Sequence, residues 1–174
     1  MNKQTLTILL VSILCVFASC KKKSAESELP DATNTGMRTI GFLANGQSRY
    51  TSGEPNSVWS AGVEYGHFAD STIDIVSSAG SPRFTFIVRF RFADKVGSYP
   101  LSSAYPCRAY YFEPTNGSTI PTDDTEFKND GLHTGQVKIT YWDGNIIAGT
   151  FDMDLVNKSG GIVHITNGRF DIPF

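Results

Sequence analysis

Alternation of apolar and polar residues over the last forty positions, Gly135 to Phe174, is the feature that most restricts how this chain can fold. Three runs alternate with a period of two, and residues typical of turns separate them. This pattern predicts half-buried antiparallel strands that form a C-terminal meander. Within the third run the parity changes at Asn167-Gly168, which predicts a turn or a bulge at that point. The runs carry no catalytic signature and define a scaffold.

The connection between the first two runs decides which of their side chains share a face of the sheet. We expect a three-residue loop, Asp143-Gly144-Asn145, in which Asn145 has the left-handed conformation. This loop pairs Tyr141 with Ile147. It also pairs Val137 with Phe151, so that the apolar sets of both strands face the core. A bulge near Gly149 is the alternative that would align the same two sets.

A strand over residues 83–92 is the strongest single prediction in the rest of the domain. One face is large and apolar at five positions, which must meet an opposing sheet. The other face carries Arg83, Arg89 and Arg91, which we expect to pair with carboxylates across the sheet rather than to bind an anion. The apolar face consists of Phe84, Phe86, Val88, Phe90 and Phe92.

The remaining segments also read as strands, with almost no helix and a long loop at 113–134. Glycine and proline interrupt them often, which favours an all-β fold. We predict an antiparallel two-layer β-sandwich, or an open barrel, of about nine strands. It occupies residues 37–174 as a single domain, large enough to bury a core without disulfides. The further strands are expected at 39–43, 63–69, 72–76, 96–101 and 109–112.

The N-terminus carries an export signal. Residues 1–19 contain one charge, Lys3, and an apolar run that is too short for a membrane span. The sequence Phe17-Ala18-Ser19-Cys20 resembles the lipobox of bacterial lipoproteins, in which the cysteine is acylated and becomes the new N-terminus. Phenylalanine departs from the commoner leucine at its position. We predict a lipoprotein signal peptide at 1–19 and lipidation at Cys20; an ordinary secretory peptide, cut elsewhere, is the alternative.

Residues 20–36 are predicted to be the lipidated cysteine and a flexible tether, because they are polar and lack apolar periodicity. Two or three acyl chains would hold the protein durably in a bilayer. The acidic run that marks surface display in some related bacteria is missing after Cys20. We therefore expect attachment to the bacterial outer membrane on its periplasmic side.

Charge and cysteine content limit the partners. Loss of Lys3 with the signal reduces the 15 basic residues to 14, against 17 acidic residues. This acidic balance argues against nucleic acid as a partner. Cys15 leaves with the signal and Cys20 is acylated, so Cys107 has no internal disulfide partner, and we expect a small buried residue rather than a nucleophile.

Four further segments of the sequence, together with the lipobox, are similar to those of a known protein family. They are LPDATNTG at 29–36, TIGFLANG at 39–46, IAGTF at 147–151 and ITNGRFD at 165–171, and the lipobox with its three lysines precedes them. Together they resemble the small bacterial lipoproteins identified as domain of unknown function 6252. The resemblance implies an envelope lipoprotein with a β-rich domain, and it brings no known activity or functional residues. We interpret its Gly-Thr-Phe and Gly-Arg-Phe-Asp sequences as places where a glycine permits a bulge and an aromatic ring fills the core.

These observations predict a lipid-anchored cell-envelope lipoprotein that is monomeric and not an enzyme, and that acts as a binding or structural accessory. Its partner would be an unidentified protein or glycan. A glycan-binding module is the first alternative, because exposed aromatic rings can stack on sugars. Its candidate ligand-binding residues are Trp142, Tyr110, Tyr111 and Tyr105.

A carboxylate-dependent hydrolase is the less favoured alternative. Asp152 and Asp154 share one strand face at a spacing that an inverting glycosidase pair could use, but we interpret them as part of a solvated outer face, because no aromatic cleft is evident beside them. The three histidines are too scattered for a zinc site, and the acidic loop at 123–130 lacks the pattern of a calcium loop. No catalytic residue, metal ligand or cofactor is predicted.

Overall fold

The computed structural model describes residues 24–53, 62–67, 72–80, 83–91, 95–101, 107–114, 120–133 and 135–173, here called the described residues. The predicted signal peptide, the lipidation site Cys20 and the candidate binding residue Tyr105 lie outside them. Among the described residues, none of the helical structure is long and apolar enough to cross a bilayer.

Antiparallel strands make up nearly all of the described structure, which confirms the all-β prediction. Nine of the eleven strands follow predicted segments, whereas β2 and β8 were not expected because their short sequences are mostly polar. The only described helical element is one 3-10 turn. The elements are η1 (Ala25–Glu28), β1 (Thr39–Ala44), β2 (Gln47–Ser52), β3 (Gly62–His67), β4 (Thr72–Gly80), β5 (Arg83–Arg91), β6 (Gly97–Pro100), β7 (Arg108–Phe112), β8 (Glu126–Lys128), β9 (Gly135–Trp142), β10 (Ile146–Val156) and β11 (Ile162–Pro173).

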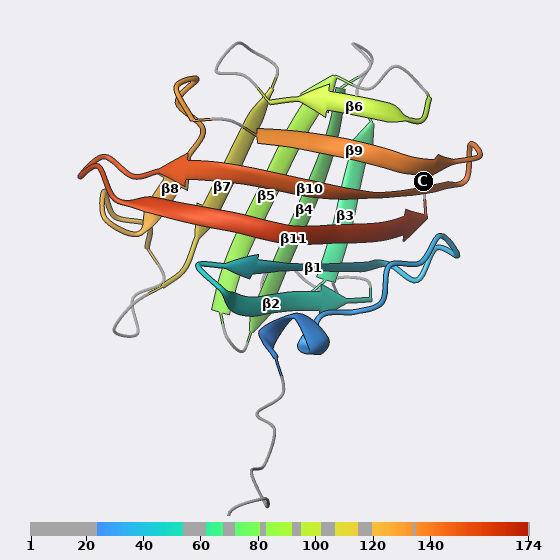
Figure 1. Ribbon diagram of the computed structural model, residues 1–174, viewed down its shortest axis with the longest axis horizontal. Coiled ribbons are helices and arrows are strands. Elements are labelled where there is room, and N and C mark those ends of the chain that lie inside the picture. The colour runs from blue at the N-terminus through green and yellow to red at the C-terminus, as the bar shows by residue number, and fades with distance from the viewer. Residues whose placement is uncertain are drawn as a thin grey trace, which may run out of the picture.

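The strands form two layers that face each other. The first layer has the order β2-β1-β11-β10-β9-β6 and contains the predicted C-terminal meander, and the second has the order β3-β4-β5-β7-β8. Figure 1 shows the strands of the second layer crossing behind those of the first at a wide angle. The sheet passes from one layer to the other where Val156 of β10 pairs with Lys128 of β8. The architecture is therefore a sandwich that closes partly into an open barrel.

Aromatic rings from both layers meet at the centre of the core. Phe42 of β1 lies 4.8 Å from the ring of Phe86 in β5, and Phe86 stacks on Phe151 of β10 at 5.0 Å between ring centroids. The alternation predicted for β5 is confirmed, because Phe84, Phe86, Val88 and Phe90 are buried. The fifth predicted position, 92, lies outside the described residues.

The β9–β10 hairpin differs from the preferred prediction. Val137 pairs with Phe151 as expected, but Tyr141 pairs with Ala148, and the register shifts between Ala148 and Gly149. The bulge alternative is thus correct and the three-residue loop is wrong.

The turn chemistry of that hairpin explains the outcome. Gly144 has the left-handed conformation, with φ 91°, and Asn145 is absent from the positive-φ residues of the described chain. Asp143 Oδ1 accepts the backbone N–H groups of Asn145 and Ile146 at 2.8 Å each. The left-handed position therefore falls on a glycine, which adopts it without steric cost.

Two glycines allow neighbouring strands to approach closely at register shifts. Gly149 lies at the β9–β10 shift, and Gly168 pairs with Phe151 next to the β10–β11 shift, beside Asn167 with φ 54°. A Cβ on Gly168 would overlap the Phe151 ring. The bulge, an alternative predicted at both places, is what the structure shows, and the structural interpretation of the two glycine-aromatic sequences is confirmed.

Gly149→Ala should lower the free energy of unfolding by about 1 to 3 kcal/mol, as overpacking of a tight site does. An added Cβ would overlap the backbone oxygen of Lys138 and come within 2.9 Å of the Phe170 ring. Urea unfolding followed by circular dichroism measures the change. Gly97→Ala on β6 is the control, because a Cβ there meets nothing closer than 4.0 Å. Equal losses at the two positions would contradict the argument.

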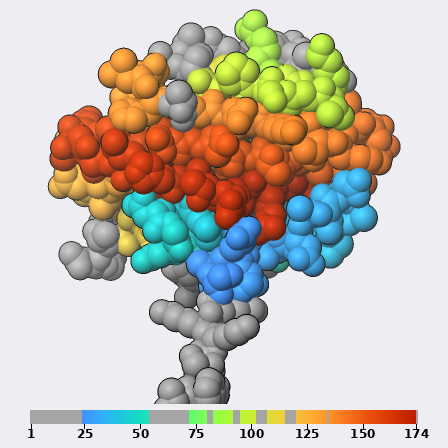
Figure 2. Space-filling view, in the orientation of Figure 1, coloured from blue at the N-terminus to red at the C-terminus, as the bar shows by residue number. Residues whose placement is uncertain are grey.

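The segment before β1 packs against the sheet, whereas the sequence predicted a flexible tether as far as residue 36. Leu29 is buried, and Pro30 lies directly on Gly41 of β1. Figure 2 shows this segment in blue against β1, β2 and β11. The turn η1 also contacts β1 and β2, so packing in the described chain begins before Met37, where the domain was expected to start.

The carboxylate of Asp171 in β11 holds this segment in place. The residue is only 1% exposed. Its oxygens accept the Thr33 hydroxyl at 2.6 Å and the backbone N–H groups of Thr35, Gly36 and Met37 at 3.0, 2.8 and 3.3 Å. We call this arrangement the Asp171 clasp.

Candidate ligand-binding site

The aromatic residues proposed as a sugar-stacking surface lie in three different environments. Tyr111 points into the core, and burial and a hydrogen bond to Glu113 raise the pKa of its hydroxyl. Tyr110, its neighbour on β7, is half-buried and belongs to the opposite face of that strand. Trp142 is half-buried at the end of β9, in the other layer, and packs against the core. The structure does not bring the three rings onto one surface.

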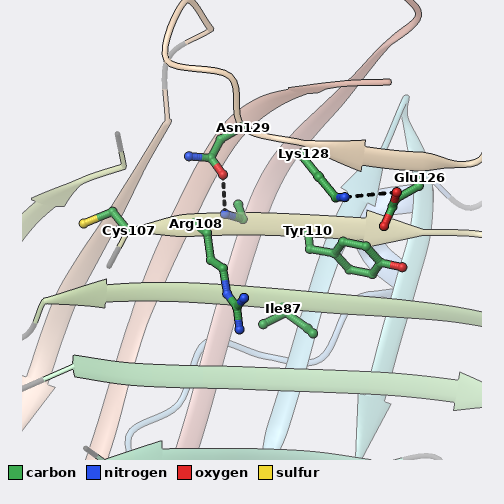
Figure 3. Close-up of a pocket in the computed structure, with 8 residues that line it drawn as sticks. Ile87, Cys107, Arg108, Tyr110, Glu126, Lys128 and Asn129 are labelled. Carbon is green, nitrogen blue, oxygen red and sulfur yellow. Dashed lines mark hydrogen bonds and ion pairs between the residues drawn. The ribbon is translucent and has the colours of Figure 1, made fainter. Parts of the chain in front are cut away.

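A pocket of about 530 Å³ lies on the outer face of the second layer, over β5, β7 and β8. Figure 3 shows its lining. Of the residues proposed from the sequence, only Tyr110 and Cys107 contribute to it. The lining consists of Ile87, Cys107, Arg108, Ala109, Tyr110, Glu126, Lys128 and Asn129.

Strand pairing assembles the pocket. Ile87 of β5 and Lys128 of β8 are both direct cross-strand partners of Tyr110 on β7. Arg108 precedes Tyr110 by two residues and therefore shares its face. In Figure 3 the guanidinium of Arg108 and the ring of Tyr110 extend on either side of Ile87. An apolar side chain thus separates a cationic group from an aromatic ring.

Asn129 shapes one wall of the pocket just beyond the end of β8. Its Oδ1 accepts the backbone N–H of Ala109 at 2.7 Å, and its own N–H donates to the Ala109 carbonyl at 3.3 Å. These two bonds continue the β7–β8 pairing by one position and fix the backbone next to Arg108.

The charges in the pocket do not cancel. Lys128 Nζ lies 3.0 Å from Glu126 Oε2, so these two groups form an ion pair. The side chain of the exposed Arg108 forms no ion pair or hydrogen bond with any described residue. Its cross-strand neighbour Arg89 is neutralised by a two-pronged ion pair with Asp74. One positive charge therefore remains at the pocket.

Tyr110 contributes a neutral hydroxyl. Burial, and to a lesser extent the negative charge of Glu126, raise the pKa of Tyr110 above its ordinary value near 10. The group therefore remains protonated at physiological pH and can donate a hydrogen bond. Its ring supplies apolar surface beside Ile87.

Cys107 is half-buried at the pocket, whereas the sequence predicted a buried residue. Activation of a thiol needs a neighbouring base or a strongly positive environment. The described lining residues include no histidine. Arg108 follows Cys107 directly, and a lining that combines a cation, an aromatic ring and apolar carbon atoms can hold a small ligand.

The other candidate groups are occupied by separate local interactions. Asp154 contacts His164 Nδ1 at 2.7 Å, while Asp152 is exposed. In the acidic loop, the backbone N–H and ring of His133 lower the pKa of Asp130 to about 2. No three His, Cys, Asp or Glu side chains gather as a metal site among the residues that the structure describes.

Sequence reasoning missed most of this pocket. The alternation Arg108-x-Tyr110 was the available signal, but the predicted strand began at 109, one residue after Arg108, and β7 begins at Arg108 itself. The neighbour that completes the wall, β8, lay inside a segment predicted to be a loop. Without β8 the partners of Tyr110 could not be identified.

Comparison with known proteins adds no relative: the chain matches no family model, no curated protein and no solved structure.

Proposed function

We propose that this protein is a lipid-anchored lipoprotein of the bacterial cell envelope whose domain binds a small ligand and performs no catalysis. The pocket over β5, β7 and β8 is the observation that carries the binding role. Its volume, about 530 Å³, falls in the range of small-molecule sites, and it combines apolar surface with a few polar groups. The anchoring role rests on the sequence Phe17-Ala18-Ser19-Cys20.

The packed N-terminal segment supports a close approach to the membrane. The turn η1 contacts β1 and β2, and only residues 21–24 separate its first residue, Ala25, from Cys20. Five residue steps extend at most about 18 Å. A tether that ran freely to residue 36 would reach on the order of 20 to 25 Å. We therefore propose that the domain lies close to the bilayer, on the periplasmic side of the outer membrane.

Cys20→Ala should release the protein from membranes, because acyl chains supply the anchoring free energy at roughly 0.8 kcal/mol per buried methylene. Separation of soluble and membrane fractions after a salt wash measures the effect. Cys107→Ala is the matched control, since that cysteine belongs to the domain and should not alter attachment. If the Cys20 variant sediments with washed membranes, the anchor is not an acyl chain at this position.

The two alternatives gain no support from the described residues. A glycan platform needs several open rings on one surface, but Tyr111 is core and Trp142 lies in the layer opposite Tyr110. A hydrolytic pair needs two carboxylates in one cleft, and Asp154 is bound to His164 while Asp152 faces solvent. We therefore favour ligand binding by the pocket.

A further inference from the structure

We infer that the pocket over β5, β7 and β8 binds a small organic monoanion, a carboxylate that carries an apolar ring or chain. This inference rests on the proposed function, because it names the class of ligand for the same site. Three properties of the lining support it: an uncompensated cation, an apolar floor, and room for one small molecule.

Arg108 supplies the recognition of charge. It is exposed and has no ion-pair partner among the described residues, whereas Lys128 is engaged by Glu126 and Arg89 by Asp74. A planar guanidinium matches a carboxylate with two parallel hydrogen bonds. Because a single cation is uncompensated, the pocket fits one negative charge better than two.

Ile87 and the ring of Tyr110 supply the apolar contact. Ile87 lies between the Arg108 guanidinium and the Tyr110 ring. A ligand whose carboxylate meets Arg108 therefore places its adjoining carbon atoms over Ile87 and its far end against Tyr110. The neutral hydroxyl of Tyr110 adds a hydrogen-bond donor at that end.

The net charge of the chain bears on whether an anion binds over the whole surface or at this pocket. The whole chain has a formal charge of −2, so a general attraction for anions is not expected from its net field. Other cations, such as Arg91, are exposed outside the pocket. Arg108 differs from them in having the apolar surface of Ile87 and Tyr110 beside it, so a small anion with an apolar part would be held at this site.

Three probes of matched shape test the inference: phenylacetate, 2-phenylethanol and phenethylamine, which carry charges of −1, 0 and +1. The full mature chain is used, held in nanodiscs, with empty nanodiscs as the blank. The readout is the rate at which N-ethylmaleimide modifies Cys107, the thiol that lines the pocket. The ratio of rates with and without probe is compared within each variant, which cancels any change in intrinsic thiol reactivity.

Phenylacetate should protect Cys107 most strongly, and Arg108→Gln should weaken that protection by about tenfold or more, because a charge-assisted hydrogen-bond pair is lost. Arg91→Gln is the matched control. Arg91 is an exposed arginine on β5 that does not line the pocket, so protection should be unchanged. Melting temperatures of both variants should match that of the native protein.

The remaining outcomes overturn one or both proposals. Equal protection by 2-phenylethanol would show that the pocket binds ligands without reading charge, and only the monoanion inference would fail. Stronger protection by phenethylamine would show that the negative charge of Glu126 determines which ligands bind. In that case too, only the monoanion inference would fail. If none of the three probes protects Cys107 at millimolar concentration, the monoanion inference fails. If a broader set of neutral and charged small molecules also fails to protect it, the proposed binding role of the pocket fails with it.

Discussion

Arg89→Ala should lower the free energy of unfolding by roughly 3 to 5 kcal/mol, the cost of leaving a buried charge without its partner. Arg89 and Asp74 are cross-strand neighbours on β5 and β4, and the guanidinium contacts both carboxylate oxygens. Their side chains are 16% and 12% exposed, so solvent screens the pair only weakly. Equilibrium unfolding in urea measures this change in free energy, and the slope of the free energy against urea concentration should be the same in both proteins.

Two variants show whether the loss comes from the unpaired carboxylate. The double variant Asp74→Ala with Arg89→Ala should recover part of the stability, because it removes the stranded charge. Arg91→Ala, at an exposed position on the same strand face, should change stability by less than about 0.5 kcal/mol. An Arg89→Ala effect no larger than that of Arg91→Ala would mean that the outer face of β4 and β5 is solvated.

Asp171→Asn should destabilise the domain by at least about 2 kcal/mol and free the segment before β1, since it removes the charged acceptor of the Asp171 clasp. The clasp joins Thr33, Thr35, Gly36 and Met37 to a single carboxylate of β11. Hydrogen exchange of residues 33–37 is the local measurement. Asp152→Asn is the matched control, because Asp152 is exposed on β10. Unchanged protection at 33–37 in the Asp171 variant would contradict the clasp.

The lowered pKa of Asp171 predicts that the stability of the domain depends on pH. Burial of Asp171 opposes its ionisation, but hydrogen bonds from Thr33 and from the backbone N–H groups of Thr35, Gly36 and Met37 outweigh that effect and lower its pKa. A lowered pKa in the folded state stabilises the fold above the ordinary aspartate pKa, about 4. That contribution is lost as the pH falls below 4 and through the lower folded value. Asp171→Asn should therefore remove part of the acid sensitivity.

Local alternation was sufficient to predict much of the fold. In β5 each second residue is a large apolar group, so the strand, its buried face and the need for an opposing layer follow from the sequence. The same alternation could not be recognised in β2, because its core-facing positions include Arg49 and Thr51, which are buried and polar. Arg49 is held there by an ion pair with Glu113 at 2.6 Å, and no pattern within β2 reveals that partner.

The sequence revealed only in part where neighbouring strands approach each other closely. The parity breaks near Gly149 and Gly168 predicted irregular pairing, because apolar residues on both sides had to reach one core. The choice between a longer loop and a bulge depended on Asp143 and Gly144 closing the turn. Both solutions satisfy the hydrophobic pattern, so the sequence pattern alone did not separate them.

The sequence by itself determined the all-β class, the inward faces of the long strands and the expectation of an acylated Cys20, because these depend on residues that are near one another in the chain. Tertiary structure alone decided the pocket and the clasp. Ile87, Arg108 and Lys128 meet through strand pairing, and Asp171 captures Thr33 across 138 positions. Partners so distant in sequence are selected by the closure of the whole sheet, which no local pattern records.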